Sequence, residues 1–165
     1  MRTIDNINDL NKSEFLSIFG NVFEKTESVA LKVFELKPFK DSDDIVSKML
    51  KIYEEYDRDK ILQILNSHPE LAIEKKLTNE SKLEQTSANL NECSEEEFEE
   101  FKKLNVEYKT KFGFPFIIAV KGKNKNEILV NFRERIQNDL NKEFLEAKNQ
   151  VKKIASFRLK DILSF

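Results

Sequence analysis

Apolar residues recur at intervals of three and four along almost the whole chain, and this spacing limits the possible folds more than any other feature. It places apolar side chains on one face of each α-helix, through which helices pack on each other. The 165 residues include only three Gly and three Pro, which disfavours a turn-rich all-β fold, while 14 Phe and three Tyr can fill a core. We therefore predict an all-α fold, a single-domain helical bundle over residues 1–165.

Local signals predict where the helices of the N-terminal half begin and end. Two short helices are expected before Pro38, on apolar stripes at 10–23 and 29–34. Asp41 or Ser42 is expected to cap the next helix and Asp57 the one after it. That helix should end before His68, because Pro69 disfavours helical geometry in the residue that precedes it.

Capping boxes predict two further helices. Ser81 with Glu84, and Ser94 with Glu97, have the required spacing, and Gly113 is placed to end the second helix. One more helix is expected around residues 128–136, and a long terminal helix from about Asn141.

Residues 114–120, Phe-Pro-Phe-Ile-Ile-Ala-Val, lack helical periodicity and are apolar throughout. No second strand candidate exists to pair with them, so we expect one short buried extended segment near Phe114–Val120. Its backbone groups need partners, which a ligand or a helix terminus can supply.

Charge and cysteine content exclude several function classes. The 28 Lys and Arg against 30 Asp and Glu give a net charge of −2, so no binding of nucleic acid or an anionic membrane is expected. The single cysteine, Cys93, cannot form an internal disulfide or a cysteine-based zinc site, and we expect an inert thiol in a reducing compartment. No apolar stretch has the length of a signal peptide or a membrane span, which predicts a soluble, cytoplasmic protein.

A few polar residues are candidates for chemistry. His68 is the only histidine, and histidine is the residue type that gains and loses a proton near neutral pH. Taken alone, a histidine at such a position is more often a structural loop residue than a catalyst. Arg158 follows Val151 by seven residues and so lies on the buried stripe of the last helix, where it needs a carboxylate, an anionic ligand or a path to water. The capping box by itself explains Ser81 and Glu84 as structural.

Five motifs occur in order along the chain. His68-Pro69-Glu70-Leu71 is followed by Ser81-Lys82-Leu83-Glu84-Gln85 and by KFGFPFII at 111–118. Arg135-Ile136-Gln137-Asn138 and Val151-x-x-Ile154-Ala155-x-x-Arg158-Leu159 complete the set. From about Leu10 to Leu163 this pattern resembles the OHCU decarboxylase family. That family acts on 2-oxo-4-hydroxy-4-carboxy-5-ureidoimidazoline (OHCU), an unstable intermediate between urate and (S)-allantoin.

The resemblance implies an all-α homodimeric enzyme that takes a small-molecule substrate and needs no metal or organic cofactor. It places the catalytic residues on His68, Glu84 and Arg158. It places the substrate-binding residues on Pro69, Ser81, Gln85, Phe114, Phe116, Ile117 and Ile118.

The resemblance also suggests how these residues act. His68 would handle the proton of the substrate hydroxyl, Glu84 would accept hydrogen bonds from ring or ureido N–H groups, and Arg158 would bind an anionic or carbonyl oxygen. Two alternatives stay open. One is a helical interaction module without turnover, and the other is a decarboxylase or lyase of a related ureido acid.

Overall fold

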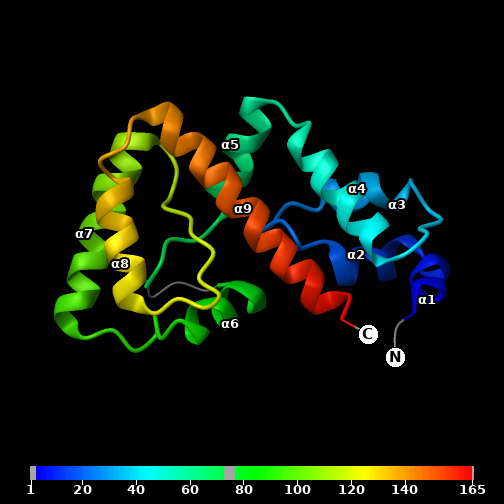
Figure 1. Ribbon diagram of the computed structural model, residues 1–165, viewed down its shortest axis with the longest axis horizontal. Coiled ribbons are helices and arrows are strands. Elements are labelled where there is room, and N and C mark those ends of the chain that lie inside the picture. The colour runs from blue at the N-terminus through cyan, green and yellow to red at the C-terminus, as the bar shows by residue number, and fades with distance from the viewer. Residues whose placement is uncertain (1–2, 73–76, 165) are drawn as a thin grey trace. The chain divides into compact units, whose positions relative to one another are not determined.

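The computed structural model describes residues 3–72 and 77–164, which form nine α-helices and contain no β-strand (Figure 1). The all-α prediction is confirmed. The helices are α1 (Ile4–Asp9), α2 (Lys12–Phe19), α3 (Ser28–Phe34), α4 (Ser42–Glu54), α5 (Arg58–Ser67), α6 (Asn79–Ser87), α7 (Glu95–Phe112), α8 (Lys125–Arg135) and α9 (Leu140–Ile162). Within the described ranges no helix is long and apolar enough to cross a membrane.

The chain divides into two compact units. The first comprises Met1–Ser67 and Lys152–Phe165, and the second comprises His68–Val151. Helices α1 to α5 and the last part of α9 therefore belong to the first unit. Helices α6 to α8 and the first part of α9 belong to the second.

In the first unit, local capping sets the ends of α4 and α5 where the sequence predicts them. The Asp41 side chain accepts a hydrogen bond from a backbone N–H in the first turn of α4. Asp57 accepts one from the N–H of Lys60 at 2.8 Å, at the start of α5. Helix α5 ends at Ser67, two residues before Pro69. These predictions are confirmed, because each depends on residues a few positions apart.

The two short helices predicted before Pro38 are present as α2 and α3, and the described part of this region contains one more helix, α1, which the sequence did not predict. Helix α2 ends at Phe19, and residues 20–27 form turns and loop in which Lys25 has a φ of 49°. Val22 and Phe23 are nevertheless buried, as their apolar spacing suggests. Spacing reports which side chains are buried, and a buried loop can carry the same spacing as a helix.

Aromatic side chains form much of the core of the first unit. The Phe15 ring lies 4.6 Å from that of Phe19 and 5.9 Å from that of Phe39. The Phe23 ring stacks on Tyr53 with 4.8 Å between ring centroids. The 20–27 loop is therefore anchored to α4 through its own aromatic residue.

In the second unit, α7 has both predicted ends. Ser94 and Glu97 form a capping box, in which each side chain accepts a hydrogen bond from the backbone N–H of the other residue. Gly113 follows the helix in the left-handed conformation, with a φ of 80°. Glycine adopts this conformation without steric cost, so it ends the helix cleanly.

The predicted start of α6 at Ser81 is wrong. The helix begins at Asn79, and Thr78 is its N-cap, with its hydroxyl accepting a hydrogen bond from the N–H of Ser81 at 3.3 Å. Ser81 and Glu84 therefore lie inside the helix rather than at its cap. Thr is also a good N-cap residue, so spacing alone did not distinguish the two possible starts.

Residues 114–120 lie between α7 and α8 as an open chain without helix or strand (Figure 1). All seven are buried. The Phe116 ring stacks on Phe132 of α8, with 3.9 Å between centroids and 9° between planes. The Tyr108 ring of α7 meets Phe116 edge-on at 5.4 Å. The prediction of a buried, non-helical segment is confirmed, and aromatic packing from two helices holds it in place.

Candidate active site

His68 is the first residue after α5, and only 9% of its surface is exposed. The loop that it begins is tied to α6 by the Gln85 side chain. The Gln85 Oε1 atom accepts a hydrogen bond from the N–H of Ala72 at 3.1 Å, and Nε2 donates to the C=O of Glu70 at 3.3 Å. One amide therefore binds the loop backbone at two points close to His68.

A second side chain holds the same loop from α7. The Nδ2 atom of Asn105 donates to the C=O of Leu71 at 3.0 Å, and Asn105 is 3% exposed. A buried backbone group without a hydrogen-bond partner costs folding free energy. This loop lies outside any helix or sheet, so the side chains of Gln85 and Asn105 stabilise it by supplying those partners. Gln85, which the sequence predicts as a substrate-binding residue, thus has a loop-holding role in the structure.

Helix α6 carries the other candidates of this region. Ser81 and Gln85 are one turn apart and both buried, at 4% and 7% exposure, and Glu84 is half-buried beside them. Side chains three and four residues apart share a helix face. Because Gln85 binds the loop that begins with His68 and Pro69, the loop is held at Glu70 and Ala72 against the face of α6 that carries Ser81 and Gln85.

The candidates of the 114–120 segment differ in what they can offer a ligand. The Phe114 ring is fully buried between Tyr108 and Phe144, and the Phe116 ring lies in the stack with Phe132. These rings belong to the hydrophobic core. A ligand would therefore contact this segment through its backbone.

Two backbone groups of this segment are bound by buried side chains. Arg135 Nη1 donates to the C=O of Ile117 at 2.6 Å, and Gln150 Oε1 accepts from the N–H of Ala119 at 2.9 Å. The sequence leaves a ligand or a helix terminus as possible partners for such groups. At these two groups the partners are instead polar side chains that α8 and α9 direct into the core.

In the first unit, Arg158 lies on the buried side of α9, as predicted, at 6% exposure. Its Nη1 atom lies 2.9 Å from Oε2 of Glu24 and donates to the C=O of Asn21 at 2.9 Å. The side chain of Glu24 is 0% exposed. The structural ion pair, one of the alternatives for Arg158, is therefore present, and the 20–27 loop supplies its carboxylate.

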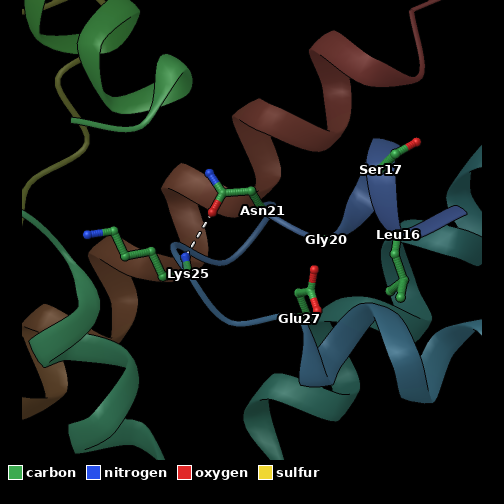
Figure 2. A pocket seen from close by; sticks show the side chains of 6 residues that line it. All are labelled: Leu16, Ser17, Gly20, Asn21, Lys25 and Glu27. Atoms are coloured by element: carbon green, nitrogen blue, oxygen red, sulfur yellow. Dashed lines mark hydrogen bonds between the residues drawn. The ribbon is translucent and has the colours of Figure 1, made fainter. Parts of the chain in front are cut away.

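The same loop lines a pocket of about 460 Å³ in the first unit (Figure 2). Its walls are Leu16, Ser17, Gly20, Asn21, Lys25 and Glu27. In Figure 2 the Asn21 side chain faces the backbone N–H of Lys25, which donates to Asn21 Oδ1 at 2.8 Å. None of the predicted site residues lines this pocket.

A pocket of about 310 Å³ in the second unit is lined by Ala72, Leu90, Asn91, Cys93, Ser94, Glu95 and Phe98. Burial, followed by the negative charge of Glu97, raises the pKa of the Cys93 thiol. A raised pKa lowers the thiolate fraction, in agreement with the inert thiol that the sequence predicts. Among the described residues, no group of His, Cys, Asp or Glu side chains could hold a metal ion.

Several important polar residues were missed by the sequence analysis. Arg135 lies seven residues after Ile128 on the buried stripe of α8, and Gln150 lies three after Ala147 on that of α9. This is the spacing that identified Arg158, so the same test finds both. Glu24 gives no such signal, because it lies in a loop and only tertiary packing buries it.

Comparison with known proteins identifies relatives of this chain. A family model described as OHCU decarboxylase matches residues 8–160. The chain is 35% identical to a 2-oxo-4-hydroxy-4-carboxy-5-ureidoimidazoline decarboxylase of Haloferax volcanii, covering 98% of this chain and 96% of the relative. It is 38% identical to a uric acid degradation bifunctional protein of Bacillus sp. strain TB-90, over 98% of this chain and 32% of that protein. The chain thus spans about a third of the length of this Bacillus relative.

Solved structures have the same fold. The crystal structure of an (S)-allantoin synthase superposes with a TM-score of 0.78 at 25% identity, covering 98% of this chain and 54% of the other. A crystal structure of OHCU decarboxylase in the presence of (S)-allantoin gives a TM-score of 0.74 at 24% identity, covering 88% of this chain and 97% of the other. The family-model match spans nearly the whole chain, and the Haloferax relative is covered almost completely. The chain belongs to the OHCU decarboxylase family.

Proposed function

We propose that this protein decarboxylates 2-oxo-4-hydroxy-4-carboxy-5-ureidoimidazoline to (S)-allantoin in urate breakdown. Family membership and the names of relatives that align over nearly their whole length support the reaction. The observation that supports the site assignment is the buried His68, in a loop that Gln85 holds against α6, the helix that also carries Ser81 and Glu84.

The chemistry requires an electron acceptor and a directed proton. The bond between the ring carbon and the carboxylate breaks, its electron pair moves into the neighbouring ring C=N, and carbon dioxide leaves. The resulting enol-type intermediate then takes a proton at the adjacent carbon, on one face. Since the substrate provides its own electron acceptor, the proposal includes no metal or organic cofactor.

Each candidate residue has a role in this scheme. His68 takes the proton of the substrate hydroxyl, and Pro69 restricts its backbone. Glu84 accepts hydrogen bonds from ring or ureido N–H groups and favours the charged form of His68. Arg158 binds an anionic or carbonyl oxygen of the substrate.

The substrate-binding set orients the ureido arm. Ser81 contributes a hydroxyl, and the backbone at Phe116, Ile117 and Ile118 contributes peptide groups. Gln85 contributes mainly by holding the His68 loop, and Phe114 helps to exclude water by filling the core beneath the segment. We further propose that residues 1–165 form one OHCU decarboxylase-like domain, and that the protein is a cytoplasmic homodimer.

The test is to generate OHCU in situ from urate with the two upstream enzymes and to follow allantoin by near-UV circular dichroism. The protein should produce one enantiomer rapidly. His68→Ala should lower the catalysed rate by about 10²–10⁴-fold, the usual contribution of a general acid or base. Far-UV circular dichroism should show an unchanged fold, since His68 is the first residue after α5 and its side chain is not part of the aromatic core.

Two glutamates of α6 provide a matched comparison. Glu84→Gln should slow turnover strongly, whereas Glu80→Gln, one turn earlier on the same helix and exposed, should not. Slow racemic product at the uncatalysed rate with the wild-type protein would refute the proposed activity and favour a helical interaction module. Turnover of another ureido acid, but not of OHCU, would identify a related decarboxylase or lyase.

A further inference from the structure

Arg135, in the last turn of α8, is a buried cation outside the proposed catalytic set. It is 8% exposed, and its guanidinium binds two groups at once. Nε donates to Oε1 of Glu143 at 2.7 Å, and Nη2 lies 2.5 Å from the same oxygen. Nη1 donates to the C=O of Ile117 at 2.6 Å. The pair with Glu143 balances its charge, and Nη1 holds the 114–120 segment.

The carboxylate of Glu143 is itself fixed from several sides. It is 0% exposed, and it accepts hydrogen bonds from the Tyr108 hydroxyl at 2.6 Å and from Asn138 Nδ2 at 3.0 Å. A carboxylate with this many donors has little freedom to move. The guanidinium that it binds is therefore held in one orientation.

The Arg135 guanidinium also lies over an aromatic ring, with its central carbon 4.4 Å from the centroid of Phe116. Arg135 thus contacts residue 116 through the ring face and residue 117 through the carbonyl. A planar guanidinium can form the carbonyl hydrogen bond, the ion pair and the stacking contact together. A lysine ammonium, although it has the same charge, cannot make all three.

Gln150 of α9 binds the segment two residues further on. Its Oε1 accepts from the N–H of Ala119 at 2.9 Å, and its Nε2 donates to Glu146 Oε1 at 2.7 Å, which fixes the amide orientation. Residues 117 and 119 are thus each held by a buried side chain, and Phe116 and Ile118 alternate with them along the segment.

The backbone groups of Phe116 and Ile118 have no such side-chain partners. No hydrogen bond joins the backbone N–H or C=O of Phe116 or Ile118 to any residue within 3–72 or 77–164. Buried backbone groups ordinarily have partners, so these groups are suited to a ligand that carries both donors and acceptors, as a ureido group does.

We propose that Arg135 and Gln150 are positioning residues, which bind the backbone of residues 117 and 119 and thereby present the backbone of Phe116 and Ile118 to the substrate. This inference rests on the proposed function. It adds two residues that do not touch the substrate but determine how well the segment binds it.

The test measures kcat and KM for OHCU generated in situ, using Arg135→Lys and Gln150→Leu. Arg135→Lys keeps the charge beside Glu143 but loses the planar fork, and Gln150→Leu removes the hydrogen bonds with the Ala119 N–H and with Glu146. Both should raise KM at least about tenfold and change kcat by less than about threefold, the result expected when uniform binding is lost.

Arg133→Lys is the matched control. Arg133 is on the same helix, pairs with Glu100 at 2.5 Å and has 52% of its side chain exposed, so KM and kcat should stay at wild-type values. A purely structural role would lower the unfolding temperature of the two test variants but leave KM unchanged.

The outcomes separate the two proposals. KM values within about twofold of wild type in both test variants, while the wild type is active, would overturn the positioning role alone. If Arg135→Lys does not fold, Gln150→Leu decides by itself, since it keeps the Arg135–Glu143 pair. An inactive wild-type protein would overturn the proposed function, and the positioning role with it.

Discussion

The buried ion pair of the first unit allows a quantitative prediction. Glu24 Oε2 and Arg158 Nη1 are 2.9 Å apart, and the two side chains are 0% and 5% exposed. At this distance and an effective dielectric constant of about 20, the attraction is about 6 kcal/mol. Desolvation offsets much of this in the intact pair. Removing one partner leaves the other charge buried, which costs about 3–5 kcal/mol.

Glu24→Gln is the perturbation that isolates the charge. The amide has the shape of the carboxylate, its oxygen can still accept from the guanidinium, and the C=O of Asn21 remains at 2.9 Å. We therefore expect a loss at the lower end of this range, about 3 kcal/mol. For a chain of this size that corresponds to a fall in Tm of about 6–12 °C.

The assay is urea unfolding followed by far-UV circular dichroism at pH 7, with wild type and variant compared at equal m-values. Glu54→Gln is the control. Glu54 pairs with Lys152, which lies on α9 as Arg158 does, and the two charged atoms are also 2.9 Å apart. These side chains, however, are 41% and 40% exposed. Removal of an exposed pair should cost at most about 1 kcal/mol.

A double variant tests the physical cause. In Glu24→Gln with Arg158→Met no charge remains buried, so this variant should be more stable than Glu24→Gln alone. If Glu24→Gln costs no more than Glu54→Gln, burial does not amplify this interaction and the reasoning is wrong.

Three further predictions concern single local features. Thr78→Ala should lower the unfolding free energy by about 1 kcal/mol, the usual value of an N-cap, and no loss in urea unfolding would mean that α6 starts elsewhere. Gly113→Ala should cost about 1–2 kcal/mol in the same assay, although an added Cβ meets no atom within 4 Å, because a φ of 80° strains any residue with a side chain. The hydrogen bond from Lys125 holds the pKa of Glu97 below the usual value for a glutamate, so its stabilisation is present above that usual value and disappears as the pH falls through the folded-state pKa. In Glu97→Gln the unfolding free energy should fall less steeply at acidic pH than in the wild type. An identical fall in both proteins would contradict the contribution assigned to Glu97.

Local signals were enough to predict much of the helical framework. The Ser94–Glu97 capping box, the Gly113 stop and the helix end before Pro69 depend on residues within a few positions of each other. The energies of these local interactions depend only on neighbouring residues, so the sequence predicts them directly. Ser81 shows the limit of this reasoning, because two residue types that cap equally well stand three positions apart.

Which polar groups meet was decided only by tertiary structure. Arg158 and the C=O of Asn21 are separated by 137 positions, and Arg135 and the C=O of Ile117 by 18. By itself, the sequence determined that Arg158 is buried, that the chain is helical and that residues 114–120 are not. It could not choose Glu24 as the partner of Arg158, or Arg135 and Gln150 as the partners of the segment. The spacing of apolar residues indicates which side chains are buried, whereas the partners of buried polar groups depend on which helices and loops pack together.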